Sequence, residues 1–293
     1  MFRMQRTYNY LSERQKFTNF IKVGICFLLI SGLMMSFNLN AQNGLTTNAG
    51  ARGLAMANTA VVFQDINSIF SNQAGLVNLS HPSFVLFTEQ RFALNEIRSI
   101  AAGFAYPTKS GVFGLNINYY GFEDYNEQKV GLAYSRKLLE NLAIGAQINY
   151  INFRIPEYGN KGFLSFEMGL QAQILKEVLL AVHIANPIGQ EIVENDNLPT
   201  VFKIGASYNP SKKVIVSLEA EKDIDFDTRI KGGIEYNLVE AFALRVGFAN
   251  NPSSFSFGLG YNLKEKLKID VGASYHQVLG FSPGLGIVFM ISK

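Results

Sequence analysis

The sequence has one cysteine, three histidines and no tryptophan in 293 residues. The cysteine, Cys26, lies in an N-terminal region that we expect to be removed, so the mature chain is predicted to have no disulfide and no thiolate chemistry. His183 and His276 are predicted on separate strands, and the motifs of serine hydrolases, zinc proteases and phosphate-binding loops are missing. We therefore expect no enzyme, no cofactor and no metal site.

Beyond residue 41 the sequence also lacks a continuous apolar run of about 18 residues, so no transmembrane helix is predicted there. The preceding region is different. Basic residues between Arg3 and Lys22 precede an apolar stretch at 23–37, and residues 39–41 (Leu-Asn-Ala) resemble a signal-peptidase site. We predict a cleaved signal peptide over residues 1–41, with an uncleaved membrane anchor as the alternative.

The excess of positive charge belongs to this leader. The whole chain has a formal charge of +3, and residues 1–41 carry five basic side chains and one acidic side chain, which leaves about −1 for the mature part. The basic pI is therefore no argument for nucleic acid as a partner.

The strongest pattern present is a two-residue alternation from about residue 84 to 291. In 255–263, Phe, Phe, Leu, Tyr and Leu alternate with Ser, Gly, Gly and Asn. Since successive side chains of a strand point to opposite faces, the large apolar side chains share one face. About fourteen such strands would enclose a lumen too wide for these side chains to fill, so the apolar face is predicted to meet lipid.

These segments predict an all-β, antiparallel transmembrane barrel over residues 83–293. Its short connections are mostly basic and its longer ones mostly acidic, which places the short turns in the periplasm. Glycines on the inward face are expected where the lumen is crowded or where another segment packs close to the wall. The first segment is ambiguous, because 84–87 (Phe-Val-Leu-Phe) does not alternate. The predicted strands are 83–89, 97–106, 110–120, 127–136, 140–153, 161–174, 176–186, 199–208, 211–221, 226–237, 240–250, 252–262, 266–276 and 280–291.

Residues 42–82 do not follow the alternation and are rich in small side chains. We predict that they form a hatch, an N-terminal plug inside or under the barrel. Their pattern resembles the hatch signature of the PorV/PorQ group in the wider FadL-like superfamily, although Gln73 stands where the signature has proline and Ala57 where glycine is common. The residues that carry the resemblance are Gly50, Arg52, Met56, Asp65, Asn72 and Gly75.

The resemblance implies a Gram-negative outer-membrane barrel, of a kind found in Bacteroidota. It implies a non-enzymatic accessory subunit of a type IX-like secretion complex or a surface-attachment complex, with outer-membrane lipid and a larger protein of that complex as partners. The alternative is a FadL-like channel for small hydrophobic compounds. A channel predicts an apolar pocket beside the hatch, whereas an accessory subunit predicts a plugged lumen.

Charged side chains of both signs are predicted on the inward face of the strands. They form either an ion-pair network that fills the lumen or a polar surface for binding or permeation. Arg52 and Asp65 of the hatch are expected to pair with them and hold the plug in place. The candidate lumen charges are Lys129, Glu167, Lys203, Glu219, Lys231, Glu235, Arg245 and Asp270.

Two longer loops, 154–162 and 187–199, carry apolar residues among polar ones. Such loops either contact a partner protein or fold over the mouth of the barrel.

Overall fold

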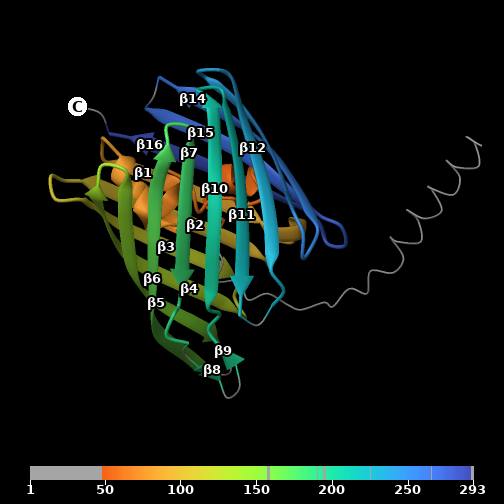
Figure 1. The fold of residues 1–293 in the computed structure, drawn as a ribbon. Helices are drawn as coiled ribbons and strands as arrows, with labels where there is room; N and C mark the ends of the chain where they lie inside the picture. The colour runs from red at the N-terminus through yellow and green to blue at the C-terminus, as the bar shows by residue number, and fades with distance from the viewer. Residues whose placement is uncertain are drawn as a thin grey trace, which may run out of the picture. The chain divides into compact units, whose positions relative to one another are not determined.

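A computed structural model describes residues 48–156, 159–189, 191–193, 196–224, 226–264 and 266–291. The predicted signal peptide lies outside these ranges. Fourteen antiparallel strands form one closed barrel, in which the last strand pairs with the first (Figure 1). The strands are β1 (Ser83–Gln90), β2 (Arg98–Pro107), β3 (Val112–Gly121), β4 (Asn126–Leu139), β5 (Leu142–Ile155), β6 (Gly159–Leu175), β7 (Val178–Ala185), β10 (Val201–Ser211), β11 (Val214–Asp223), β12 (Arg229–Val239), β13 (Phe242–Ala249), β14 (Ser254–Leu263), β15 (Leu267–His276) and β16 (Gly280–Met290).

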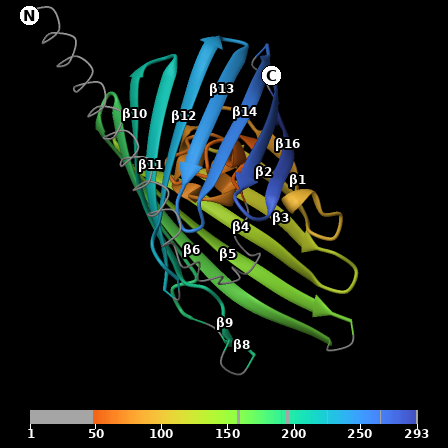
Figure 2. The ribbon, with the colours of Figure 1, turned by 90° about the vertical axis from the view of Figure 1, so that its right-hand side faces the viewer.

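Each predicted strand corresponds to one of these, with ends that differ by a few residues, so the predicted fold class is confirmed. One element was not predicted. The connection between β7 and β10 contains a small hairpin, β8 (Glu191–Val193) and β9 (Asp196–Asn197). This hairpin forms its own two-stranded sheet and lies beyond one end of the barrel (Figures 1 and 2).

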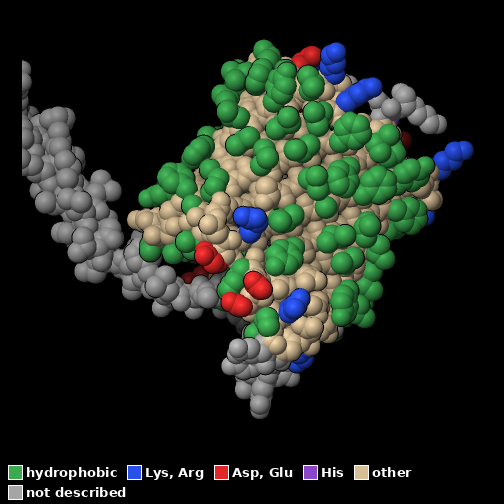
Figure 3. Space-filling view, turned by 180° about the vertical axis from the view of Figure 1, so that it is seen from behind, with side chains coloured by type: hydrophobic (Ala, Val, Ile, Leu, Met, Phe, Trp, Pro, Cys, Tyr) green, Lys and Arg blue, Asp and Glu red, His purple; other side chains and the backbone are tan. Residues whose placement is uncertain are grey.

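The two faces of the wall differ as the alternation predicts. In β14, Phe255 and Phe257 are 59% and 51% exposed, whereas Ser256 between them is 4% exposed. Hydrophobic side chains cover much of the outer surface, with few charged side chains among them (Figure 3). An outer surface of this kind is stable in lipid, because burying it in a bilayer removes apolar area from water.

Residues 48–82 lie inside the barrel, and we call them the hatch (Figure 2). Their helices are α2 (Gly50–Ala55), η1 (Ile66–Phe70) and η2 (Gln73–Asn78). A further turn, η3 (Arg91–Ala93), follows β1. No helix among the described residues is long and apolar enough to cross a bilayer.

Strand β1 does not alternate because both of its faces meet apolar surroundings. Phe84 and Leu86 are exposed on the outer face, whereas Val85 and Phe87 are buried in the same apolar cluster as hatch residue Ile69. The apolar inner face of this strand is therefore part of the core that fixes the hatch.

Wall glycines allow the hatch to approach the strands closely. A Cβ atom built on Gly145 would collide with the backbone of Gln73 and Ala74, and one built on Gly169 would collide with the Asn72 side chain. Of the two explanations for inward glycines, these positions fit close packing of another segment against the wall.

The two ends of the barrel are distinct. The short-turn end carries the connections β10–β11, β12–β13 and β14–β15. The opposite, long-loop end carries the β7–β10 connection, and there Leu198 is buried against Ile151 and Phe153. This connection thus reaches over the mouth in part, although its residue Ile188 remains 63% exposed.

Candidate functional site

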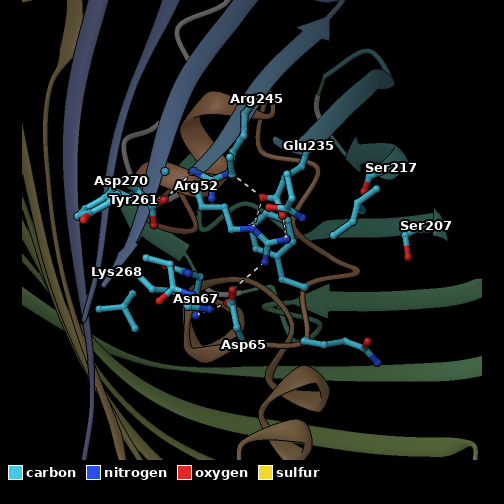
Figure 4. Close-up of a pocket in the computed structure, with 18 of the residues that line it drawn as sticks. Arg52, Asp65, Asn67, Ser207, Ser217, Glu235, Arg245, Tyr261, Lys268 and Asp270 are labelled. Carbon is cyan, nitrogen blue, oxygen red and sulfur yellow. Dashed lines mark hydrogen bonds and ion pairs between the residues drawn. The ribbon is translucent and has the colours of Figure 1, made fainter. Parts of the chain in front are cut away.

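The contact between hatch and wall is centred on Arg52. Its guanidinium donates to Glu235 through Nε and Nη2, at 2.8 and 3.2 Å, and to Asp65 through Nη1 at 2.7 Å. Arg245 donates to the same Glu235 and to Asp270, both at 2.6 Å. Two arginines and three carboxylates from the hatch and from β12, β13 and β15 therefore form one network (Figure 4).

Asp65 also begins the next turn of the hatch. Its carboxylate accepts a hydrogen bond from the Asn67 amide at 2.8 Å and so caps η1. Burial alone would raise the pKa of Asp65, but the charges of Arg52 and Lys268 and this hydrogen bond together lower its pKa below the ordinary value. Asp65 is therefore held as a carboxylate.

A second cluster lies on β10, β11 and β12. Lys231 is 1% exposed and donates to Glu219 at 3.0 Å and to Glu221 at 2.6 Å. Lys203 lies 3.3 Å from Glu221. Glu219 also accepts a hydrogen bond from the backbone amide of hatch residue Val61 at 2.9 Å. This wall carboxylate therefore ties the hatch backbone to the barrel.

A third cluster surrounds Glu167 of β6. Lys129 lies 3.4 Å from one oxygen, and Asn149 donates to that oxygen at 2.9 Å. The other oxygen accepts from hatch residue Gln73 at 2.8 Å and lies 3.4 Å from His183 Nε2. Together the three clusters place all eight predicted lumen charges in ion pairs.

The other motif residues have structural roles within the hatch. Gly50 has φ +69°, and a Cβ there would collide with the Asn67 side chain. A Cβ on Gly75 would likewise meet the Phe63 carbonyl oxygen. Met56 is fully buried, and its carbonyl accepts hydrogen bonds from the amide and hydroxyl of Thr59.

Asn72 joins the hatch to the wall. Its Oδ1 accepts from the Ala74 amide and caps η2, and its Nδ2 donates to the wall carbonyls of Leu170 and Val182 at 3.3 and 3.2 Å. Because Gly169 has no side chain, only strand backbone separates Asn72 from the outer surface at this point.

Several polar residues at the contact were not predicted. Gln171 of β6 donates to the backbone carbonyls of Val61 and Phe63 at 3.0 and 2.9 Å, and Asn48 donates to Glu89 at 2.7 Å. Gln171 occupies an inward position of the alternation, so the two-residue period alone indicates that it faces the lumen. Its hatch partners are not visible in the sequence.

On the short-turn side of the hatch lies a polar cavity of about 330 Å³, which we call the vestibule (Figure 4). Hatch residues Phe63, Asp65 and Asn67 line it on one side. Inward-facing residues of β10 to β15 line the rest, among them Ser217 and Lys268.

A second cavity, of about 490 Å³, is an apolar groove on the outer surface of β5, β6, β7, β10 and β11, which we call the wall groove. Outward side chains such as Leu170, Val182 and Ile204 line it. Gly169 also lines it, so the groove lies directly behind Asn72. Within the described ranges, no cluster of His, Cys, Asp and Glu could hold a metal ion.

No protein-family model matches the sequence, and no curated protein matches it. Solved structures do match the fold. The monoaromatic hydrocarbon channel CymD has a TM-score of 0.66 at 10% identity, over 86% of this chain and 100% of that chain. The Pseudomonas putida toluene transporter TodX has a TM-score of 0.63 at 11% identity, over 86% and 97%. A Pseudomonas aeruginosa FadL homologue has a TM-score of 0.58 at 10% identity, over 82% and 96%.

This chain has the fold of the FadL-like outer-membrane barrels. The fold therefore supports the resemblance to the FadL-like superfamily. These comparisons do not bear directly on membership of the PorV/PorQ group or on a role in type IX secretion. The matched FadL-like structures are described as channels and transporters rather than enzymes.

Proposed function

We propose that this chain is an outer-membrane channel for small hydrophobic compounds, in which the hatch closes the lumen and cargo exchanges with lipid through the wall groove. The likeness in fold to a hydrocarbon channel and a toluene transporter supports this proposal. The observation that carries it is the position of the wall groove, whose floor at Gly169 lies directly behind Asn72 of the hatch.

The chemistry of the two cavities favours a sideways path. Most of the vestibule lining is charged or polar side chains, and an apolar molecule would have to displace their water without replacing its hydrogen bonds. Most of the residues that line the wall groove are apolar, and Lys222 and Thr228 are among its few polar ones. At the long-loop end, which we place outside the cell, the exposed Ile188 of the β7–β10 connection offers a first apolar contact for cargo.

The test is uptake of radiolabelled toluene by proteoliposomes that contain the purified protein. Ala220 faces outward in the wall groove, so Ala220→Trp fills the groove without touching the hatch. We expect this variant to take up toluene more slowly than the wild type. The matched control is Ala102→Trp, an outward alanine on β2 at a distance from the groove. Equal uptake by both variants and the wild type would contradict the proposal.

A second candidate is the accessory subunit of a secretion or surface-attachment complex. The anchored hatch favours it, because ion pairs and hydrogen bonds tie the hatch to β6, β7, β11 and β12. The test is purification from native outer membranes, with a variant that lacks the β8–β9 hairpin as the control. A larger partner that is retained by the wild type and lost by that variant favours this candidate. Recovery of the protein alone, with a bound hydrophobic compound, favours the channel.

A further inference from the structure

The vestibule is not used by the proposed channel. Its rim is formed by residues at the short turns, such as Asn209 and Asn262, and its floor is the hatch. A volume of about 330 Å³ is at the lower end of small-molecule binding pockets, which span roughly 300–1,000 Å³. The cavity therefore has room for a small molecule that enters from the short-turn end.

The charges in the vestibule leave little preference for an ion. The carboxylates of Asp65, Glu235 and Asp270 already accept hydrogen bonds from Arg52 and Arg245. Lys268 supplies a third positive charge beside these three negative ones, and the fourth carboxylate of the lining, Glu240, is exposed at the short-turn rim. An ion of either sign would have to break existing pairs in order to gain new ones.

The groups that lack a partner are uncharged. The Ser217 hydroxyl is almost fully buried, with the residue 1% exposed, and it has no hydrogen-bond partner in the described part of the chain. The Oδ1 atoms of Asn209 and Asn262 are also buried, and they too have no hydrogen-bond partner among the described residues. All three residues face inward and line the vestibule, from β10, β11 and β14. Buried polar groups in proteins are nearly always hydrogen-bonded, so three such atoms in one cavity indicate a partner from outside the chain.

From this geometry we infer that the vestibule binds a small, neutral, polyhydroxylated molecule of the sugar or polyol class. Amide oxygens accept hydrogen bonds from hydroxyl groups, and the Ser217 hydroxyl both donates and accepts. A hydroxyl-rich molecule offers hydrogen-bond partners to these orphan groups and leaves the surrounding ion pairs intact. Because it also contacts Asn67 on the floor, its binding stabilises the seated hatch.

The test uses the purified full-length mature protein in detergent, with glucose and trehalose as probes. Equilibrium dialysis is expected to show saturable binding of at least one probe, and thermal unfolding of the protein should shift to a higher midpoint as that probe is added. Ser217→Ala should weaken binding by about 2- to 10-fold, the effect of losing one buried hydrogen bond.

Ser135→Ala is the matched control. Ser135 is also a fully buried wall serine whose hydroxyl has no partner in the described residues, but it does not line the vestibule. The Ser135→Ala protein should bind the probe with the same affinity as the wild type does. Three outcomes overturn the inference: no saturable binding of either probe, binding that Ser217→Ala leaves unchanged, or an equal loss in Ser135→Ala. In the first case the orphan groups are satisfied by water alone. None of these outcomes affects toluene uptake, so the channel proposal is tested separately.

Discussion

Gln73 of the hatch donates a hydrogen bond from Nε2 to Oε2 of Glu167 in the wall at 2.8 Å. Gln73 stands where the hatch signature of the PorV/PorQ group has a proline, a residue that could not make this bond. Both partners are buried, at 0% and 7% exposure, and they come from segments 94 residues apart. The departure from the signature therefore adds a polar anchor between the hatch and β6.

We expect Gln73→Met to destabilise the protein by about 1–3 kcal/mol, because it keeps the side-chain volume but removes a donor from a buried carboxylate. Gln73→Pro should cost a similar amount, since proline is tolerated at the first position of a helical turn such as η2. The measurement is urea unfolding in detergent. Gln64→Met, at an exposed hatch position, serves as the control and should change little.

The strands could be predicted from the sequence because the two-residue period is a local property. In β14 it is enough to tell Phe257 on the outer face from Ser256 on the inner face. The period fails in β1, where Val85 and Phe87 face an apolar hatch instead of a polar lumen. That exception depends on which segment packs against the strand. The sequence of the strand itself does not identify that segment.

The sequence predicts that charged side chains of the hatch and the wall meet inside the barrel, but it does not predict which side chains pair with each other. The alternation places Glu167, Glu219 and Glu235 inside the barrel, and the hatch motif points to Arg52. Which carboxylate each hatch group meets depends on the rotation of the hatch within the lumen. That rotation is set by close packing against wall glycines such as Gly145, a contact between distant segments.

A second prediction concerns the Arg52 network. Arg52→Ala leaves Asp65 without its ion pair and removes one of the two arginines from Glu235. Loss of one partner of a buried pair typically costs about 3–5 kcal/mol, so unfolding in urea should shift to a clearly lower concentration. Arg52→Lys should recover only part of this loss, because a single ammonium cannot reproduce the three hydrogen bonds of the guanidinium fork. Full recovery with lysine would show that charge alone holds the hatch.

A third prediction separates close packing from backbone conformation. Gly169→Ala puts a methyl group against the Asn72 side chain and should destabilise the barrel by about 1–3 kcal/mol, as overpacking of a well-packed core does. Gly232→Ala is the matched control, because its Cβ would meet only Leu218 Cδ2 at an ordinary 3.5 Å. Protease digestion of the hatch in intact proteoliposomes is expected to be faster for the first variant alone. If both alanines have the same effect, the contact with Asn72 is not the cause.

The last prediction follows from the lowered pKa of Asp65. A carboxyl group whose pKa is lower in the folded state than its ordinary value of 3.8 contributes stability above that value and loses it as the pH falls through the folded pKa. Asp65→Asn removes this contribution at every pH. The difference in unfolding free energy between wild type and Asp65→Asn should thus be constant over about pH 5 to 8 and shrink in more acidic solution.

Comparison of the two proteins at each pH isolates Asp65, because the other carboxyl groups titrate in both. The measurement is urea unfolding in detergent over a series of acidic buffers. Arg52 stays charged throughout, so the shrinking difference reports protonation of Asp65 and release of its pair with Arg52. A difference that grows on acidification would mean that the Asp65 pKa is raised in the folded protein, and that the burial of this carboxyl outweighs the two nearby positive charges.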